Sequence, residues 1–109
     1  MTIDVEALTK QMFDAAIEVL RGKAPSIESY VQGECAKIAT TFVMIESGLR
    51  SGVISQPEGV ILLDMQKSAT RSVFLTAEGL GALVVEASIN AALAVVRPAV
   101  NAALGFALL

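Results

Sequence analysis

Apolar residues recur at three- and four-residue steps along most of the chain, the spacing of one face of an α-helix. The first such stretch predicts a helix over residues 3–21, whose apolar positions are Val5, Leu8, Met12, Ala15, Ala16, Val19 and Leu20. Thr2 can cap this helix, and Asp4 and Glu6 suit the positive end of its dipole. Residues 22–25 predict its end, and so short a break favours an antiparallel neighbour.

A second helix is predicted over residues 26–50. Its apolar face consists of Ile27, Val31, Ile38, Phe42, Ile45 and Leu49. Gly33 and Gly48 weaken this helix by about 1 kcal/mol each relative to alanine. The dipeptide at residues 51–52, Ser-Gly, ends it. Because the break at residues 22–25 is short, we expect the first two helices to form a hairpin.

The third helix has the clearest start signal in the chain, a capping box formed by Ser55 and Glu58 with Pro57 in the first turn. Apolar or small positions then continue in phase at Leu62, Met65, Ala69, Val73, Thr76, Leu80, Leu83 and Ala87. Because the phase passes through Gly79 and Gly81, we expect one long helix over residues 56–96, straight or bent at these glycines. Such a helix spans roughly 60 Å and must project past its neighbours or fold back at the glycines.

A proline in a helix interior removes a hydrogen bond and clashes with the preceding turn. We therefore expect Pro98 to kink or end the long helix, and residues 99–108 to form a short last helix. Together the elements predict an all-α, bundle-like single domain over residues 1–109. We divide it into an amphipathic helical hairpin (1–54), the amphipathic start of the third helix (55–78) and an apolar tail (79–109).

Composition indicates that this domain has more apolar surface than it can bury alone. Hydrophobic residues make up 54% of the chain and the mean hydropathy is +0.65, whereas about 45–50% apolar residues is usual. The surplus favours contact with a second subunit or with lipid. It consists mainly of Ala, Val and Leu, which favours close helix packing.

The apolar tail carries only two charges, Glu86 and Arg97. With Asn90 and Asn101 they follow one side of a helix; we call these four residues the polar line. Glu86 and Arg97 are eleven residues apart, roughly 16 Å along one helix, too far to pair within it. They can pair between two antiparallel copies. Alternatively, the line is a solvent-facing edge, meets lysines of the first two helices (Lys10, Lys23 and Lys37), or lies within a membrane-embedded bundle.

We expect the tail to be an interface between copies of the chain. The residues assigned to this interface are Glu86, Asn90, Arg97, Asn101, Leu83, Ala87, Leu93, Val100, Leu104 and Phe106. Small residues four apart, such as Ala87 and Ala91, allow helix backbones to approach closely. A homo-oligomer follows from this interpretation.

As a membrane span the tail is poorly built. A span needs about twenty mainly apolar residues. Residues 80–96 are seventeen and include Glu86 and Asn90, and no cluster of basic residues flanks them. Extension to residue 109 places Arg97 and Pro98 inside the segment. The sequence thus favours a helix-packing surface, with membrane contact as the alternative.

Candidate chemistry is sparse. The chain has no histidine, no phosphate-binding or nucleophile motif, and a single cysteine, Cys35, which we interpret as a buried, inert thiol. The run at residues 67–72 is interpreted as a solvated helix face. A net charge of −3 and the absence of Trp argue against nucleic-acid binding. We expect no catalytic residues, no cofactor, no metal and no small-molecule substrate.

These observations predict a non-catalytic structural or assembly subunit that homo-oligomerises through its C-terminal helices, such as a component of a phage particle or a secretion-type assembly. Because no basic segment precedes an apolar one at the N-terminus, we expect no signal peptide and a cytoplasmic or virion-associated protein. One alternative is a membrane-active, pore-forming or ejection-type protein whose tail enters lipid. A weaker one is a small helical bundle that binds an apolar ligand.

Overall fold

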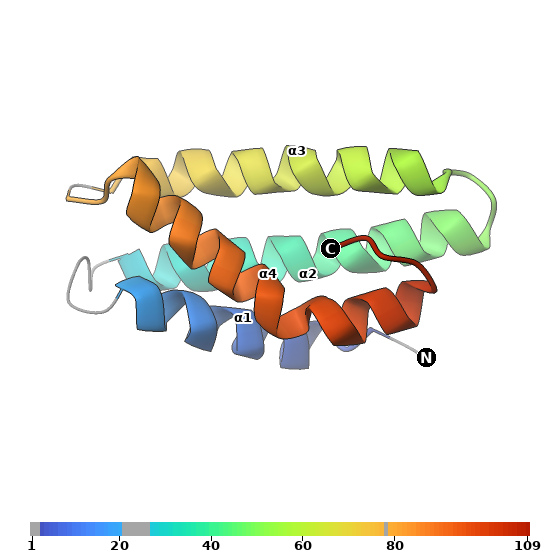
Figure 1. The fold of residues 1–109 in the computed structure, drawn as a ribbon, viewed down its shortest axis with the longest axis horizontal. Helices are drawn as coiled ribbons and strands as arrows, with labels where there is room; N and C mark the ends of the chain where they lie inside the picture. The colour runs from blue at the N-terminus through green and yellow to red at the C-terminus, as the bar shows by residue number, and fades with distance from the viewer. Residues whose placement is uncertain (1–2, 21–26, 78) are drawn as a thin grey trace.

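A computed structural model describes residues 3–20, 27–77 and 79–109. These residues form four α-helices: α1 (Val5–Leu20), α2 (Glu28–Arg50), α3 (Gln56–Leu75) and α4 (Ala82–Leu104). Consecutive helices run in opposite directions, giving an elongated up-and-down bundle of 43 × 22 × 19 Å (Figure 1). The predicted all-α, bundle-like fold is confirmed over the described residues, which contain no strand.

Helix α1 begins with a side-chain cap. The Oδ1 atom of Asp4 accepts a hydrogen bond of 3.1 Å from the backbone N–H of Ala7, which leaves one fewer unpaired amide in the first turn. The cap expected from Thr2 and the helix end expected at 22–25 lie outside the described residues. The buried positions of α1 are Leu8, Met12, Ala16 and Leu20, all members of the predicted apolar face.

Helix α3 begins as predicted. The Ser55 hydroxyl accepts a hydrogen bond from the Glu58 N–H (3.3 Å), and the Ser55 N–H donates to Oε1 of Glu58 (2.9 Å). The hydrogen bond from the Ser55 amide, followed by that of its hydroxyl group, lowers the pKa of Glu58. The capping box therefore fixes where α3 begins, and it favours the ionised form of the Glu58 carboxylate in the first turn.

The prediction of one helix over residues 56–96 is wrong. Helix α3 ends at Leu75, and α4 begins at Ala82 and returns alongside it. Gly79 has φ +88°, a conformation that side-chain-bearing residues avoid, and Gly81 is extended (φ −86°, ψ 165°). The apolar positions of α3 continue into α4 with the same helical period. Periodicity alone therefore does not reveal that the chain reverses between the two helices.

Of the two outcomes expected at Pro98, a kink or an end of the helix, the helix does not end there, and the prediction of a short last helix is wrong. Pro98 lies inside α4, which continues to Leu104 and has 23 residues. Pro98 and the residue one turn before it, Ala94, are both exposed, so water can reach the carbonyl that lacks an N–H partner. Figure 1 shows that α4 changes direction along its length, and a proline is a usual cause of such a bend.

The core lies where α4 crosses onto the hairpin. Helix α1 packs most extensively on α4 and then on α2, while α3 packs mainly on α2. The largest fully buried side chains include Met12, Phe42, Phe74, Ile38, Ile45, Ile89, Val96 and Val100. Contact between α3 and α4 is much less extensive, because α4 diverges from α3 toward α1 after the turn.

A small polar network joins α2 to α3 inside the bundle. Glu34 is 4% exposed; one of its carboxylate oxygens accepts from the Thr70 hydroxyl (3.1 Å) and the other from Lys37 Nζ (2.9 Å). Gln66 in turn donates to the Thr70 hydroxyl oxygen (3.2 Å). Both carboxylate oxygens therefore have partners, as a buried charge requires.

Candidate interaction surface on helix α4

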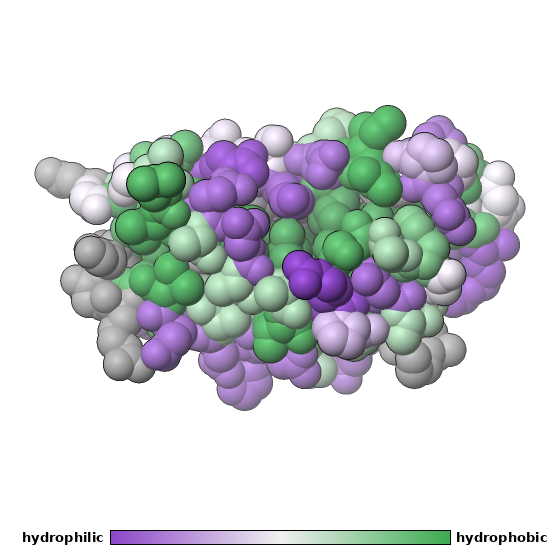
Figure 2. All heavy atoms as spheres, viewed as in Figure 1, coloured by the Kyte–Doolittle hydropathy of each residue, from purple (hydrophilic) through white to green (hydrophobic). Residues whose placement is uncertain are grey.

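Helix α4 presents an uncharged stripe to the outside. Its members recur every three or four residues, with Ala94 and Val95 adjacent, and face away from α1 and α2; they are Leu83, Ala87, Ala91, Ala94, Val95, Pro98 and Ala102. We call these seven residues the outer face of α4. All but Ala91 are exposed, Leu83 to 88% and Val95 to 47%. Figure 2 shows mostly apolar surface along the course of α4, with hydrophilic residues gathered between α4 and α3.

The opposite side of α4 is the core side. Its buried positions are Val85, Ser88, Ile89, Ala92, Leu93, Val96 and Val100. The Ser88 hydroxyl donates to the Val85 carbonyl (2.7 Å), so even its one polar side chain is satisfied locally. Helix α4 is therefore apolar on both its inner and its outer side. Such a helix normally has neighbours on both sides or lies in a membrane.

The polar line runs between these two sides, on the flank that faces α3. Glu86 accepts hydrogen bonds from Arg71 Nε (2.8 Å) and Arg71 Nη2 (3.3 Å). The hydrogen bonds from Arg71 lower the pKa of Glu86, with smaller contributions from the charges of Arg71 and Lys67. Within the chain, the partner of Glu86 thus comes from α3.

This ion pair corrects one sequence-based alternative, in which lysines of the first two helices met the polar line. Lys10 pairs with Asp14 and Lys37 with Glu34, while Lys23 lies outside the described residues. The run at 67–72, interpreted as a solvated face, supplies Arg71 instead. Its spacing gave no sign of this role, because only the reversal at Gly79 brings α3 beside Glu86.

The other members of the polar line have different environments. Asn90 and Arg97 are exposed and line a 190 Å³ cavity between α3 and α4, together with Asp64 and Lys67. Among the described residues, no carboxylate lies within ion-pair distance of Arg97. Asn101 bonds the backbone of Leu109. The line therefore has partners at both ends and none at Arg97.

The apolar residues assigned to the interface fall into three groups. Leu83 and Ala87 lie on the outer face of α4, Leu104 and Phe106 are partly buried, and Leu93 and Val100 are buried in the chain's own core. The assignment did not include Ala91, Ala94, Val95, Pro98 or Ala102. A helical wheel of residues 82–104 drawn without a break at Pro98 places them with Leu83 and Ala87.

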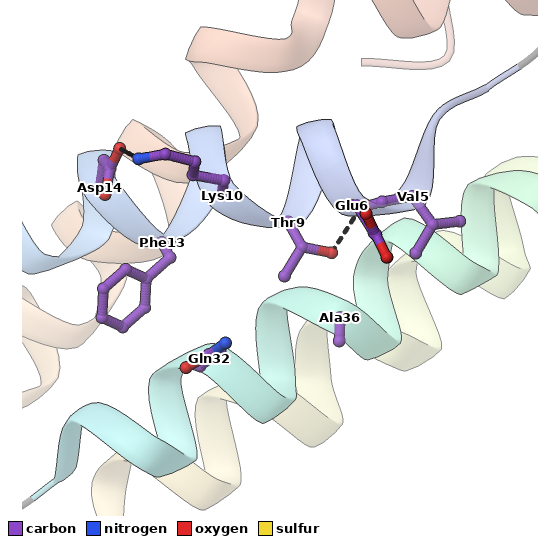
Figure 3. Close-up of a pocket in the computed structure, with 8 residues that line it drawn as sticks. All are labelled: Val5, Glu6, Thr9, Lys10, Phe13, Asp14, Gln32 and Ala36. Atoms are coloured by element: carbon purple, nitrogen blue, oxygen red, sulfur yellow. Dashed lines mark hydrogen bonds and ion pairs between the residues drawn. The ribbon is translucent and has the colours of Figure 1, made fainter.

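A groove larger than the cavity between α3 and α4 lies elsewhere, between α1 and α2. It has a volume of about 590 Å³ and is lined by Val5, Glu6, Thr9, Lys10, Phe13, Asp14, Gln32 and Ala36 (Figure 3). Lys10 and Asp14 pair along one edge (3.0 Å), and the Thr9 hydroxyl donates to the Val5 carbonyl (2.6 Å). Three of its polar side chains, Thr9, Lys10 and Asp14, thus already have partners within the chain, and the groove presents no nucleophile–base pair.

The single thiol is deeply placed. Cys35 is 2% exposed, and burial, with a smaller contribution from the neighbouring Glu34 charge, raises its pKa to about 12. At neutral pH it is therefore a protonated, weakly nucleophilic group. Among the described residues, His, Cys, Asp and Glu form no group of three or more that could hold a metal ion.

Helix α4 is also the one described helix that is long and apolar enough to cross a membrane. Its best window has a mean hydropathy of 1.6, and 39% of that window is buried against the rest of the chain. The core helix of a water-soluble bundle meets the same criteria. Comparisons with family models, curated proteins and solved structures give no significant match.

Proposed function

We propose that this protein is a non-catalytic assembly subunit, a four-helix bundle that self-associates through the outer face of α4. The observation that carries the proposal is a seven-residue stripe without a charge on a helix that is already buried on its other side. Exposed helix faces of monomeric proteins normally carry polar side chains. A component of a phage particle or of a secretion-type assembly is the setting we favour.

The shape of the outer face suits another helix. Ala87, Ala91, Ala94 and Ala102 are small, and they border Leu83 and Val95, which protrude. Interaxial distances between packed helices depend on side-chain size at the contact, and small residues permit the shortest ones. The protruding side chains of one copy would fill the shallow positions above the alanines of the other.

The charges favour an antiparallel arrangement about a two-fold axis. The midpoint between Glu86 and Arg97 falls beside Ala91, at the centre of the outer face. In an antiparallel pair that crosses there, each of these charges lies roughly 8 Å from the axis, and Glu86 of one copy faces Arg97 of the other. The same patch then serves both subunits, as two-fold symmetry requires.

A second copy suits the edge of this surface better than lipid does. Arg97 and Asn90 flank the outer face and are exposed. Insertion scales assign about 2.5–3.5 kcal/mol to an arginine at the centre of a membrane-spanning helix. A protein partner that offers a carboxylate avoids most of this cost, and Glu86 of the second copy, shared with its own Arg71, is such a group.

Sedimentation analysis at micromolar concentration tests the proposal. Ala94→Glu places a charge on the outer face without touching the core, and we expect it to raise the dissociation constant at least ~100-fold, because a buried unpaired charge costs several kcal/mol. Gln11→Glu, on the exposed side of α1, is the matched control and leaves association unchanged. A wild-type protein that stays monomeric at this concentration contradicts the proposal.

A charge exchange tests the antiparallel arrangement separately. Glu86→Arg weakens association, because like charges then meet across the axis, and adding Arg97→Glu restores part of it. The Glu86→Arg variant also loses its pair with Arg71, so thermal unfolding of both variants is measured as a control. Failure of the double variant to recover shows that the two residues do not face each other.

A second candidate function is favoured by the length and hydropathy of α4, which suffice to cross a membrane. In this proposal the protein is membrane-active, and α4 leaves the bundle to enter lipid. Flotation with vesicles of neutral and of anionic lipid is the measurement. Full-length protein that remains with the soluble fraction in both cases contradicts it.

A further inference from the structure

The divergence of α4 from α3 leaves a groove between these helices, and the chain fills it with its own last residues. Figure 1 shows residues 105–109 turning back from the end of α4 into the space between the two helices. We call these residues the strap. Leu108 is 8% exposed, and with Leu109 it borders the 190 Å³ cavity lined by Leu63 of α3 and Leu93 of α4.

Few interactions hold the strap. The Asn101 side chain accepts a hydrogen bond from the Leu109 N–H (3.0 Å) and donates one to the Leu109 carbonyl (3.4 Å). Leu108 is the strap's one buried side chain; Phe106 and Leu109 are partly buried and Ala107 is exposed. The cavity beside it shows that the groove is not completely filled. The groove thus recognises a short apolar segment through one buried leucine and one side-chain amide.

Gly105 is the hinge of the strap. Its φ of +80° turns the chain back toward α3, and its N–H donates to the Asn101 carbonyl (2.9 Å). A Cβ atom placed there meets no atom within 4 Å, so only the backbone conformation favours glycine. An extended hinge would direct residues 106–109 away from their own groove.

We propose that the strap exchanges between copies, so that residues 106–109 of one molecule occupy the α3–α4 groove of a second molecule, and the reverse. This inference rests on the proposed self-association and adds a second interface, distinct from the outer face of α4. The groove contacts are the same whether a strap occupies its own groove (the closed form) or that of a second molecule (the exchanged form). The hinge conformation and the protein concentration therefore decide between the two forms. Two different two-fold interfaces on one subunit generate an open chain of subunits rather than a closed dimer.

Cross-linking of two differently labelled full-length chains tests the exchange. One chain carries Leu109→Cys, the other is isotopically heavy and carries Lys67→Cys, and both positions border the same cavity. A short bismaleimide then joins residue 109 of one chain to residue 67 of the other only if the strap has crossed. The native Cys35 is buried and its raised pKa keeps it unreactive. We expect the mixed-mass 109–67 species in mixtures incubated at high concentration.

The hinge supplies a quantitative variant. Gly105→Val disfavours the form in which the strap occupies its own groove, because a side-chain-bearing residue avoids a positive φ. The cost is about a factor of ten in the equilibrium constant for each hinge. Reciprocal exchange opens two hinges, so its equilibrium constant should rise ~100-fold. Gly79→Val is the matched control, because Gly79 has a similar φ (+88°) and equally open space but lies in the α3–α4 turn. We expect the mixed-mass product to rise with the first substitution and not with the second.

A diluted chain that carries both cysteines shows that the reagent spans the cavity, because it forms the link within one molecule. Absence of the mixed-mass product, with and without Gly105→Val, overturns the exchange. If Ala94→Glu still dissociates the oligomer in that case, the proposed function stands and only the exchange fails. If the mixed-mass product forms and Ala94→Glu has no effect on association, the exchange stands and the outer face of α4 is not an interface.

Discussion

Helices α1 and α4 pack on each other, yet they present opposite kinds of surface to the outside. The exposed side of α1 carries Glu6, Lys10, Gln11, Asp14 and Glu18, whereas the outer face of α4 carries no charge. Helix α1 therefore matches a position at the surface of a bundle, and α4 matches a position in its middle. Under the proposed self-association, a second copy supplies the neighbour on the outer face of α4.

The largest effects are expected from substitutions on the inner sides of the two helices. A substitution on the outer face of α4 serves as the contrast. Met12→Ala and Ile89→Ala each remove fully buried side-chain volume, and each should lower the free energy of unfolding by about 2–5 kcal/mol in urea titrations. Val95→Ala should change it by no more than about 0.5 kcal/mol under monomeric conditions. A loss for Val95→Ala as large as that for Ile89→Ala, measured in the monomer, contradicts the assignment of the two sides.

A smaller effect is expected at the turn that brings α4 beside α3 and α1. Gly79→Ala forces a Cβ onto a residue at φ +88° and should lower the free energy of unfolding by about 1–2 kcal/mol. Gly33→Ala, in an exposed helical position with open space around it, should raise it by about 0.4–1 kcal/mol. If α3 and α4 formed one continuous helix, both substitutions would stabilise the protein. Chemical denaturation of the pair distinguishes the two cases.

The smallest effect concerns the ion pair that fixes which flank of α4 faces α3. Because Arg71 lowers the pKa of Glu86 in the folded state, this pair adds stability above the ordinary value of 4.5, and that stability is lost as pH falls through the lowered pKa. Glu86→Gln should therefore lower stability at neutral pH by about 0.2–1 kcal/mol, the range of exposed pairs.

The pH dependence of the same variant provides the control. The lowered pKa of Glu58 acts in the same direction but is present in both proteins, so it cancels in the comparison. The difference between wild type and Glu86→Gln should shrink as the pH falls below about 4.5, as followed by thermal unfolding across this range. A difference that grows on acidification contradicts the pairing of Glu86 with Arg71.

The contrast between α1 and α4 also explains how much of the fold could be predicted from the sequence. Where one side of a helix is polar, as at Lys10 and Asp14, the apolar period identifies the buried side, and α1 and α2 were predicted to within two residues at each described end. The capping box identified the start of α3 for a local chemical reason. In α4 both sides are apolar, so the period could not distinguish the core side from the outer face.

Two errors in the predicted fold have local causes. The register of apolar residues is unchanged across Gly79, and only its positive φ turns the chain back, which no spacing rule reports. Pro98 stays helical because its side of α4 is exposed. The missed reversal at Gly79 also hid the partner of Glu86. Arg71 lies beside Glu86 only because the chain turns back between α3 and α4.

The extensive contact between α1 and α4 also has a consequence during synthesis. These helices are the first and last along the described chain, and α1 packs more extensively on α4 than on α2. A ribosome adds about 5–20 residues per second, so α1 must await its main neighbour for several seconds in a nascent chain. Over that interval the buried side of α1, which includes Leu8, Met12 and Ala16, lacks its most extensive neighbour and can contact chaperones or other nascent chains.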